Sequence, residues 1–465
     1  MTTKTTGKRS TTKNGAPLSI PPLAKPRKIR APRIVSQTLP NGLRVIAMLK
    51  RGAPVLEARL RIPVDRNNRS TFAKGTVLAE TMLKGTKQRP GTAFEQDLGL
   101  TGGTLDVSFD RDKIRIGGMT LVDYAGQFLH LLADALLNAS YTPRTIDAER
   151  ARLTERIAIA ASSSGVIAAK TLASTLYGQN PYGILLPEAA DMAPVTAATV
   201  RALHRKLVLP HDALLVLVGD LSATKAIALA EKAFGDWTGS LGRSEAKPPQ
   251  VALVGPLVLV DRPDAVQSSI HFGGAGLDRF DPGHPAQLVA NTIFGGNFSS
   301  RLVANLREDK GYTYSPRSAL DLGRLATTFS VVADVATDVT AASINEIEYE
   351  LRRMVSTSVQ STELEAARDY LIGSSSLALA TQAGLATSVA NLEFAGASLD
   401  WMRELLVLIG KVTAQDVAAT ALRMMRPTLM RTVVVGAAAE LEIPLAAIVP
   451  AVESFRAEQS LDNKD

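Results

Sequence analysis

The sequence predicts an α+β fold made of two homologous halves, each an α/β sandwich of about 200 residues. Three observations lead to this prediction. Strand-like apolar runs alternate along the chain with stretches at helical spacing. The apolar run at 214–218 ends at Gly219, and a similar run at 432–435 ends at Gly436, an offset of roughly 215 residues. Between the halves, residues 240–249 are mostly polar, aperiodic and contain Gly and Pro, as expected for a linker.

Local signals place the elements of the first half. Asn41-Gly42 is a turn that leads into a strand. Apolar residues alternate on both sides of 110–112, which predicts a β-hairpin with one buried face. Thr142-Pro143 fits an N-cap followed by Pro at the first helical position. The predicted order is a strand at 43–48, a helix at 76–84, the hairpin at 104–117, helices at 128–136 and 143–162, a strand at 214–218 and a helix at 227–234.

The second half is expected to repeat this order. Thr362 and Glu365 have the spacing of a capping box and predict the start of a long helix. The predicted elements are strands at 257–260 and 268–272, helices at 286–294 and 301–308, a strand at 326–332, the helix from 362 and a strand at 432–436. The corresponding boundaries are a basic disordered tail at 1–35, domains at 36–240 and 256–455 separated by a linker at 241–255, and a polar tail at 456–465.

The composition excludes several classes of protein and site. The chain has 465 residues, of which 46% are hydrophobic and 21% charged, which is typical of a globular protein with sizeable cores. It contains no cysteine. Disulfide frameworks, thiolate metal sites and a cysteine nucleophile are therefore excluded.

The positive charge is concentrated at the N-terminus. Residues 1–40 contain nine Lys or Arg and no acidic residue, so removing these nine from the formal charge of +7 leaves −2 for the rest of the chain. Because the predicted folded body is not basic, nucleic-acid binding is not expected. The tail lacks the apolar run of a secretory signal, and no run of 18 apolar residues predicts a transmembrane helix. These patterns favour a cytoplasmic over a periplasmic location.

Five stretches together resemble the pitrilysin/insulinase family of metallopeptidases, the inverzincins. They follow the family's order along most of residues 38–440. The stretches are Leu39–Val45, Met82–Thr86 with Arg89–Thr92, Gly102–Leu105, Leu217–Asp220 with Ala233–Trp237, and Ser300–Glu308 with Gly311–Ser315. The resemblance implies one half of a clam-like peptidase shell.

The metal motif of the family is degenerate in this chain. Catalytic members carry H-x-x-E-H on a helix, with two His ligands for zinc and a Glu as general base. The matching segment has Val77 and Thr81 at the two His positions and retains only Glu80. Glu155 is the nearest match to the family's third ligand. We therefore expect no metal, and no complete catalytic site, in this chain.

None of the five histidines offers a replacement for this motif. No two of them form an i, i+4 pair. His204 and His211 are interpreted as surface or loop residues.

A second family feature is retained. In the family, an Arg and a Tyr seven residues apart contact the substrate backbone beside the scissile bond, and Arg307 and Tyr314 match this spacing. Tyr312 competes for the role of the tyrosine, on the same strand face if the strand is regular. Gly295-Gly296 matches the family's glycine-rich bend, where glycine more often serves chain geometry than substrate contact. The edge strand of the hairpin at 104–117 is a further candidate for pairing with an extended substrate.

The resemblance includes enzymes made of two chains, one with the zinc motif and one with the Arg/Tyr pair. This chain looks like the second kind: a non-catalytic, substrate-binding subunit of a heterodimeric zinc metallopeptidase, inactive alone, with Zn²⁺ on a homologous partner. Arg307 and Tyr314 would bind peptides or unfolded polypeptides against that zinc. The alternatives are an inactive scaffold subunit of a larger assembly and a peptide-binding module without hydrolysis. A self-sufficient peptidase is the least favoured.

Overall fold

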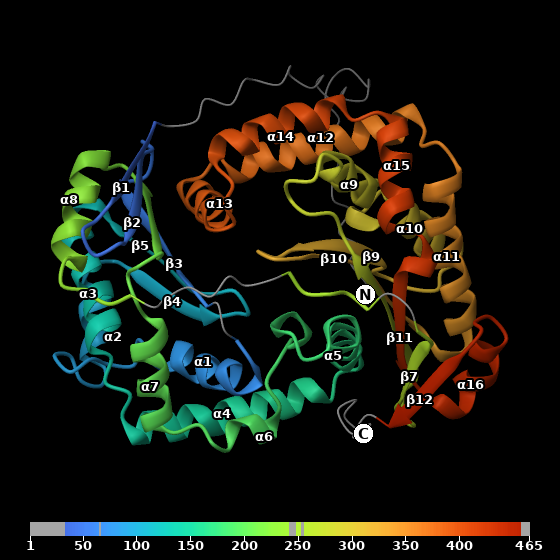
Figure 1. Ribbon diagram of the computed structural model, residues 1–465, viewed down its shortest axis with the longest axis horizontal. Coiled ribbons are helices and arrows are strands. Elements are labelled where there is room, and N and C mark those ends of the chain that lie inside the picture. The colour runs from blue at the N-terminus through green and yellow to red at the C-terminus, as the bar shows by residue number, and fades with distance from the viewer. Residues whose placement is uncertain (1–32, 65–66, 241–247, 253–254, 457–465) are drawn as a thin grey trace, which may run out of the picture. The chain divides into compact units, whose positions relative to one another are not determined.

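The computed structural model describes residues 33–64, 67–240, 248–252 and 255–456. The predicted linker at 241–255 and the tails at 1–35 and 456–465 fall mostly outside these residues. The described part contains two six-stranded mixed sheets with helices (Figure 1). The strands of sheet 1 lie in the order β1 (Ile34–Thr38), β2 (Arg44–Leu49), β6 (Leu214–Gly219), β3 (Val55–Pro63), β5 (Lys113–Leu121) and β4 (Thr104–Phe109). Those of sheet 2 are β12 (Val452–Arg456), β7 (Leu257–Asp261), β11 (Met430–Gly436), β8 (Gln267–Ala275), β10 (Thr327–Ala336) and β9 (Arg317–Leu322).

Five of the six strands in each sheet correspond in order and direction, which confirms the predicted repeat of two halves. In both, the second and third strands are parallel, and the third to sixth strands are successively antiparallel. The first strand differs. In sheet 1 it is β1, antiparallel to β2, whereas in sheet 2 it is β12, parallel to β7. The edge of sheet 1 is thus formed by β1, the first strand that the structure describes, and the corresponding edge of sheet 2 by β12, the last one.

Helices cover the sheets in each half, and each half has its own apolar core. In the N half these helices are α1 (Arg69–Thr81), α2 (Ala93–Leu100), α3 (Ala125–Asn138), α4 (Pro143–Ala161), α5 (Ser164–Tyr177), α6 (Ala189–Met192), α7 (Ala197–Leu207) and α8 (Ala223–Phe234). In the C half they are α9 (His284–Asn291), α10 (Arg301–Val303), α11 (Thr340–Ser356), α12 (Ser361–Ala378), α13 (Gln382–Phe394), α14 (Leu399–Lys411), α15 (Ala414–Met424) and α16 (Ala438–Ala446). Among the described helices, no single one is long and apolar enough to cross a membrane.

The halves exchange one helix each. Helix α5 packs on β8 and β11 of sheet 2, and α13 packs on β3 and β6 of sheet 1. The first contact is apolar, with Leu172 and Leu176 beside Val433 and Val435. The second also contains hydrogen bonds: Arg59 donates to the Thr387 hydroxyl and the buried Arg61 to the Asn391 side chain. Burial, aided by the neighbouring Arg115 and Arg59, lowers the pKa of Arg61 to about 10.

Three predicted helices differ from the structure in detail. Helix α1 begins at Arg69 rather than near 76, because the side chain of Asn68 accepts the Thr71 amide and caps it there. The capping box of α12 consists of Gln360 and Glu363, two residues before the predicted box. The helices predicted at 286–294 and 301–308 begin as α9 and α10 and continue as the π-helices η3 (Thr292–Gly296) and η4 (Ala304–Asp309). Such π-helical turns are frequent at functional sites.

Candidate substrate-binding site

The helix that carries the degenerate metal motif is packed and offers no ligands. Val77 has no exposed surface and belongs to the core of the N half. Thr81 is buried, and its hydroxyl donates to the Val77 carbonyl at 2.6 Å. A serine or threonine bonded to the preceding turn in this way satisfies its own hydroxyl. The two positions that match the family's histidines therefore have a structural role in this chain.

The carboxylate of Glu80 is bound by two arginine side chains. It accepts hydrogen bonds from Arg152 Nη2 at 2.9 Å and from Arg156 Nη1 at 3.1 Å. Both arginines lie four residues apart on α4 and thus on one face of that helix. Arg152 is also bound by Glu149 at 2.6 Å. Glu80 is consequently part of a partly exposed ion-pair network, and its carboxylate is not free to act as a base.

The residues at this position do not fit zinc. Glu155, the match to the third ligand of the family, is exposed on α4. Within the residues that the structure describes, no group of three or more His, Asp or Glu side chains is arranged to hold a metal ion. Zinc requires three or four such donors at close range. No chemical step in this chain is therefore assigned to a bound metal.

The two histidines interpreted as surface or loop residues differ in their surroundings. His211 lies in the loop before β6, half exposed, with its Nδ1 2.7 Å from Asp212. The interpretation is wrong for His204, which lies in α7. Its Nε2 donates to the Leu136 carbonyl and its Nδ1 accepts from the Tyr141 hydroxyl, both at 2.8 Å. Burial lowers the pKa of His204, so it serves as a neutral structural residue.

The glycine bend of the C half allows close packing. A Cβ at Gly295 would lie 2.8 Å from the Ser318 backbone nitrogen, and a Cβ at Gly296 would lie 2.9 Å from the Asn291 carbonyl oxygen. Real side chains do not tolerate such distances, so both positions require glycine for geometry. The bend turns the chain out of η3 toward Asn297, whose backbone is extended.

Arg307 and Tyr314, predicted as a pair, are in contact. The guanidinium carbon of Arg307 lies 4.4 Å from the centroid of the Tyr314 ring, and 4.7 Å from that of Phe298. The cation is thus covered by two aromatic rings, at the distance of a cation–π contact. Both rings are largely exposed, Tyr314 by 78% and Phe298 by 68%. Besides the rings, the Arg307 side chain has one partner among the described residues. Its Nε lies 3.2 Å from the carboxylate of Glu308.

The tyrosines 312 and 314 lie in a loop, because β9 begins only at Arg317. The regular strand that would place them on one face is therefore absent. Tyr312 is held through its backbone, with its amide bound to the Leu306 carbonyl at 2.8 Å. Of the two, Tyr314 is the one recorded in ring contact with Arg307. Tyr314 is therefore the neighbour of the arginine, and its role as the substrate-binding tyrosine stays a prediction.

The predicted hairpin is present and ends sheet 1. β4 pairs only with β5 in the described sheet, so its other edge is available. The turn of the hairpin is bound to the C half. Arg111 Nη2 lies 2.5 Å from Asp321, and the Tyr182 hydroxyl donates to Asp112 at 3.0 Å. The hairpin is therefore anchored at its turn while its edge strand remains open.

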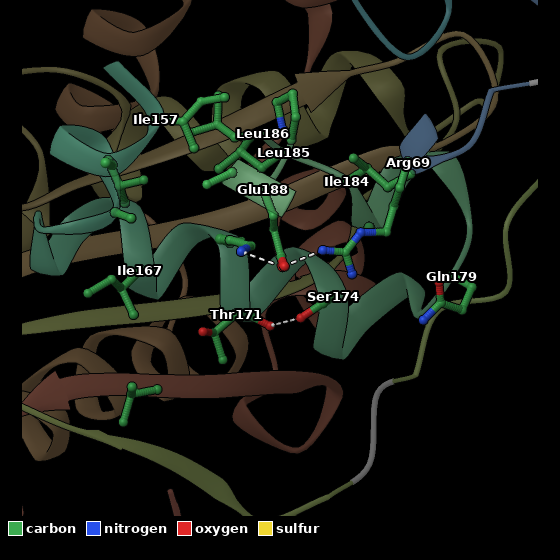
Figure 2. Close-up of a pocket in the computed structure, with 18 of the residues that line it drawn as sticks. Arg69, Ile157, Ile167, Thr171, Ser174, Gln179, Ile184, Leu185, Leu186 and Glu188 are labelled. Carbon is green, nitrogen blue, oxygen red and sulfur yellow. Dashed lines mark hydrogen bonds and ion pairs between the residues drawn. The ribbon is translucent and has the colours of Figure 1, made fainter. Parts of the chain in front are cut away.

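A cavity of about 310 Å³ lies beside α5 (Figure 2). Its walls are mainly apolar and come from the end of α4, from α5, from residues 183–189 and from Val260 and Phe455 of sheet 2. Three charged side chains line it: Glu188 accepts from Lys170 Nζ at 2.8 Å and pairs with Arg69. Burial opposes the ionisation of Glu188, but these two cations outweigh it and lower its pKa. The cavity shares no lining residue with the Arg307 site.

Sequence reasoning missed Phe298, the two arginines that neutralise Glu80, and the cavity. The i, i+4 spacing of Arg152 and Arg156 on a predicted helix was a signal for a shared acidic partner. Phe298 lies in an irregular segment with no periodicity, so no pattern identified its neighbour.

Comparisons with known proteins agree with the resemblance. Residues 76–188 match the family model described as insulinase (peptidase family M16), and residues 194–371 match the model of the peptidase M16 inactive domain. An uncharacterized zinc protease of Streptomyces coelicolor is 24% identical over 394 residues, which are 83% of this chain and 85% of that protein. The β subunit of the mitochondrial-processing peptidase of Caenorhabditis elegans is 23% identical over 304 residues, 62% of this chain and 65% of that protein.

Solved structures show the same fold. A peptidase M16 inactive domain from Pseudomonas fluorescens superposes with a TM-score of 0.81 at 20% identity, covering 87% of this chain and 98% of that one. A protease from Helicobacter pylori gives a TM-score of 0.79 at 18% identity, covering 87% and 99%. The two family models together match more than half of the residues, and this chain belongs to the insulinase (M16) family of peptidases.

Proposed function

We propose that this chain is the non-catalytic, substrate-binding subunit of a heterodimeric zinc metallopeptidase that cleaves peptides or unfolded polypeptides. Zn²⁺ would be held by a homologous partner subunit. Arg307 and Tyr314 would bind the substrate beside that metal. The observation that carries the proposal is the contact between Arg307 and Tyr314 in the C half, in a chain whose own zinc-motif helix is filled by Val77 and Thr81.

The geometry of Arg307 suits the chemistry of peptide hydrolysis. Negative charge develops on the carbonyl oxygen in the transition state, and donors placed in advance stabilise it. The guanidinium is in contact with two aromatic rings, and among the described residues its terminal Nη groups have no acceptor. Those donors point in the plane of the group, where a carbonyl or carboxylate oxygen binds best. The Tyr314 hydroxyl is a second donor on the same exposed surface.

Two further features support this role. The open edge of β4 can pair with an extended backbone through main-chain hydrogen bonds, which tolerates varied side chains. Several relatives are named zinc proteases, and one solved structure of this fold is described as an inactive domain. A pairing of an inactive with an active chain accounts for both descriptions.

A peptide-binding protein without hydrolysis is the second candidate. The apolar cavity beside α5 favours it, because a volume of about 310 Å³ is sufficient for a small ligand or a bulky side chain. In that case substrate binding would depend on the cavity and on β4, and no zinc-bearing partner would be required.

The test is a gentle purification of the tagged chain from its native host. We expect a co-purifying subunit of similar size, zinc bound to that subunit, and cleavage of an unstructured peptide that a chelator abolishes. Peptide binding without cleavage in the presence of all co-purifying proteins would favour the second candidate. A large, inactive assembly that binds no peptide would instead point to a scaffold role and contradict the proposal.

A further inference from the structure

Phe298 is an exposed aromatic residue in direct contact with a charged side chain. It lies between η3 and α10 with 68% of its surface exposed, and the centroid of its ring is 4.7 Å from the guanidinium carbon of Arg307, which also contacts Tyr314. A phenylalanine exposed to this degree gains little from burial. Its contact with the guanidinium is therefore the interaction that the structure offers to explain its position.

The segment that carries Phe298 is fixed at both ends. Before it, Gly295 and Gly296 pack closely against Ser318 and Asn291. After it, the buried Arg301 forms two hydrogen bonds with Glu363, of 2.7 and 2.8 Å. The short stretch between these anchors has few alternative paths, so the Phe298 ring is held near Arg307 by its backbone.

We propose that Phe298 is a positioning residue for Arg307. The inference rests on the proposed role of Arg307 in substrate binding, and it adds how that side chain is held. An arginine has several rotatable bonds, and ordering them on substrate binding costs entropy. The two rings restrict the guanidinium in the free protein, while its Nη groups have no acceptor among the described residues. The ligand that fits is an oxygen acceptor in the plane of the guanidinium, such as a main-chain carbonyl of an extended peptide.

The positioning can be measured without any enzyme activity. Protons above or below an aromatic ring resonate upfield, so the Phe298 ring should shift the Arg307 Nε–H signal, assigned by its loss in Arg307→Lys, upfield of the position that the neighbouring Glu308 alone would give it. Phe298→Ala should move it downfield, and Phe298→Trp should restore the upfield position. Tyr349→Ala is the matched control, because it removes another exposed ring that contacts an arginine, Arg353 at 5.5 Å. An Arg307 signal that Phe298→Ala leaves unchanged overturns the proposal.

Activity then tests the functional consequence. In the complex with its partner, Phe298→Ala should lower kcat/KM for an unstructured peptide by about two- to fivefold, the scale of an exposed cation–π contact. Phe298→Trp should recover most of this loss, and Phe298→Ala should add nothing in an Arg307→Ala background. An additional loss in that background, or failure of the subunits to assemble, would show that Phe298 acts by another route. If no active complex exists, the proposed function fails while the resonance still decides the positioning.

Discussion

The two halves of the molecule share a strand order but use the corresponding positions differently. The helix after β3 is α1, where Val77 and Thr81 are buried and Glu80 is bound by two arginines. The helix after β8 is α9, which leads through η3 to the exposed Phe298 and to Arg307. In the first half the carboxylate of Glu80 and the hydroxyl of Thr81 are satisfied within the chain, whereas in the second the guanidinium of Arg307 lies against two exposed aromatic rings. A repeated fold therefore does not imply a repeated function, since a few side chains decide it.

Burial lowers the pKa of one histidine in the N half, His204, and of two in the C half, so acid should destabilise the C half more, with the largest effect predicted here. Burial lowers the pKa of His271 and His284 in the C half to about 4. The unfolded chain binds these protons near pH 6.5, so the stabilisation present above that pH is lost as the pH falls toward 4. For the two histidines the loss is on the order of 5 kcal/mol at pH 4.5.

The two tryptophans provide the readout. Trp237 is buried in the N half. In the C half, the ring centroids of Trp401 and His284 are 5.8 Å apart. Acid unfolding followed by fluorescence should show a transition at higher pH in Trp237→Phe, which retains Trp401, than in Trp401→Phe. Coincident transitions would mean that the halves unfold as one unit. An earlier transition at Trp237 would contradict the assignment of acid sensitivity to the C half.

Restoring the histidines of the metal motif should damage the N half without creating a zinc site. Val77→His with Thr81→His places two larger polar rings in a filled core and breaks the Thr81 hydrogen bond. We expect a loss of about 2–4 kcal/mol in the free energy of unfolding by urea, and no stoichiometric zinc in elemental analysis. Val77→Ala with Thr81→Ser controls for the loss of the original side chains. Tight binding of one zinc per chain would show that the old site remains intact and that only its ligands have changed.

The ion pairs of Glu80 should contribute little to the free energy of unfolding. The carboxylate is about one-third exposed and its arginines are about half exposed, so screening reduces the benefit. We expect Glu80→Gln to lower the free energy of unfolding by about 1 kcal/mol or less, with a smaller difference at high salt. Asp400→Asn is a suitable control, because Asp400 pairs with Arg403 on the surface of α14. A cost of several kcal/mol would indicate that Glu80 does more than close a surface network.

Much of the architecture could be predicted from the sequence, because apolar periodicity and the restart after the linker reflect the two cores. β3 could not. Its sequence carries Glu57, Arg59 and Arg61 at alternate positions, which is atypical of a central strand. The two arginines are accommodated because α13, some 330 residues later in the chain, supplies Thr387 and Asn391 as partners, and Glu57 pairs with Arg59. The exchange of helices between halves is a long-range property that no local pattern encodes.

The candidate site was likewise predictable from the sequence only in part. The loss of both metal-motif histidines and the spacing of Arg307 and Tyr314 were readable from the sequence alone. The contact of Arg307 with Phe298 depends on a glycine bend and two π-helical turns, which set the path of the backbone. Local sequence rules describe helices and strands but not these irregular segments.

The central claim is that the C half contributes to peptide cleavage and the motif of the N half does not. It is tested most directly by a paired assay of Arg307→Ala and Glu80→Gln in the complex with the proposed zinc-bearing partner, with turnover of an unstructured peptide as the readout. We predict that Arg307→Ala lowers kcat/KM about tenfold or more, as for other donors to a developing oxyanion, and that Glu80→Gln changes it by less than about twofold. Unchanged turnover with Arg307→Ala, or its collapse with Glu80→Gln, would contradict this account.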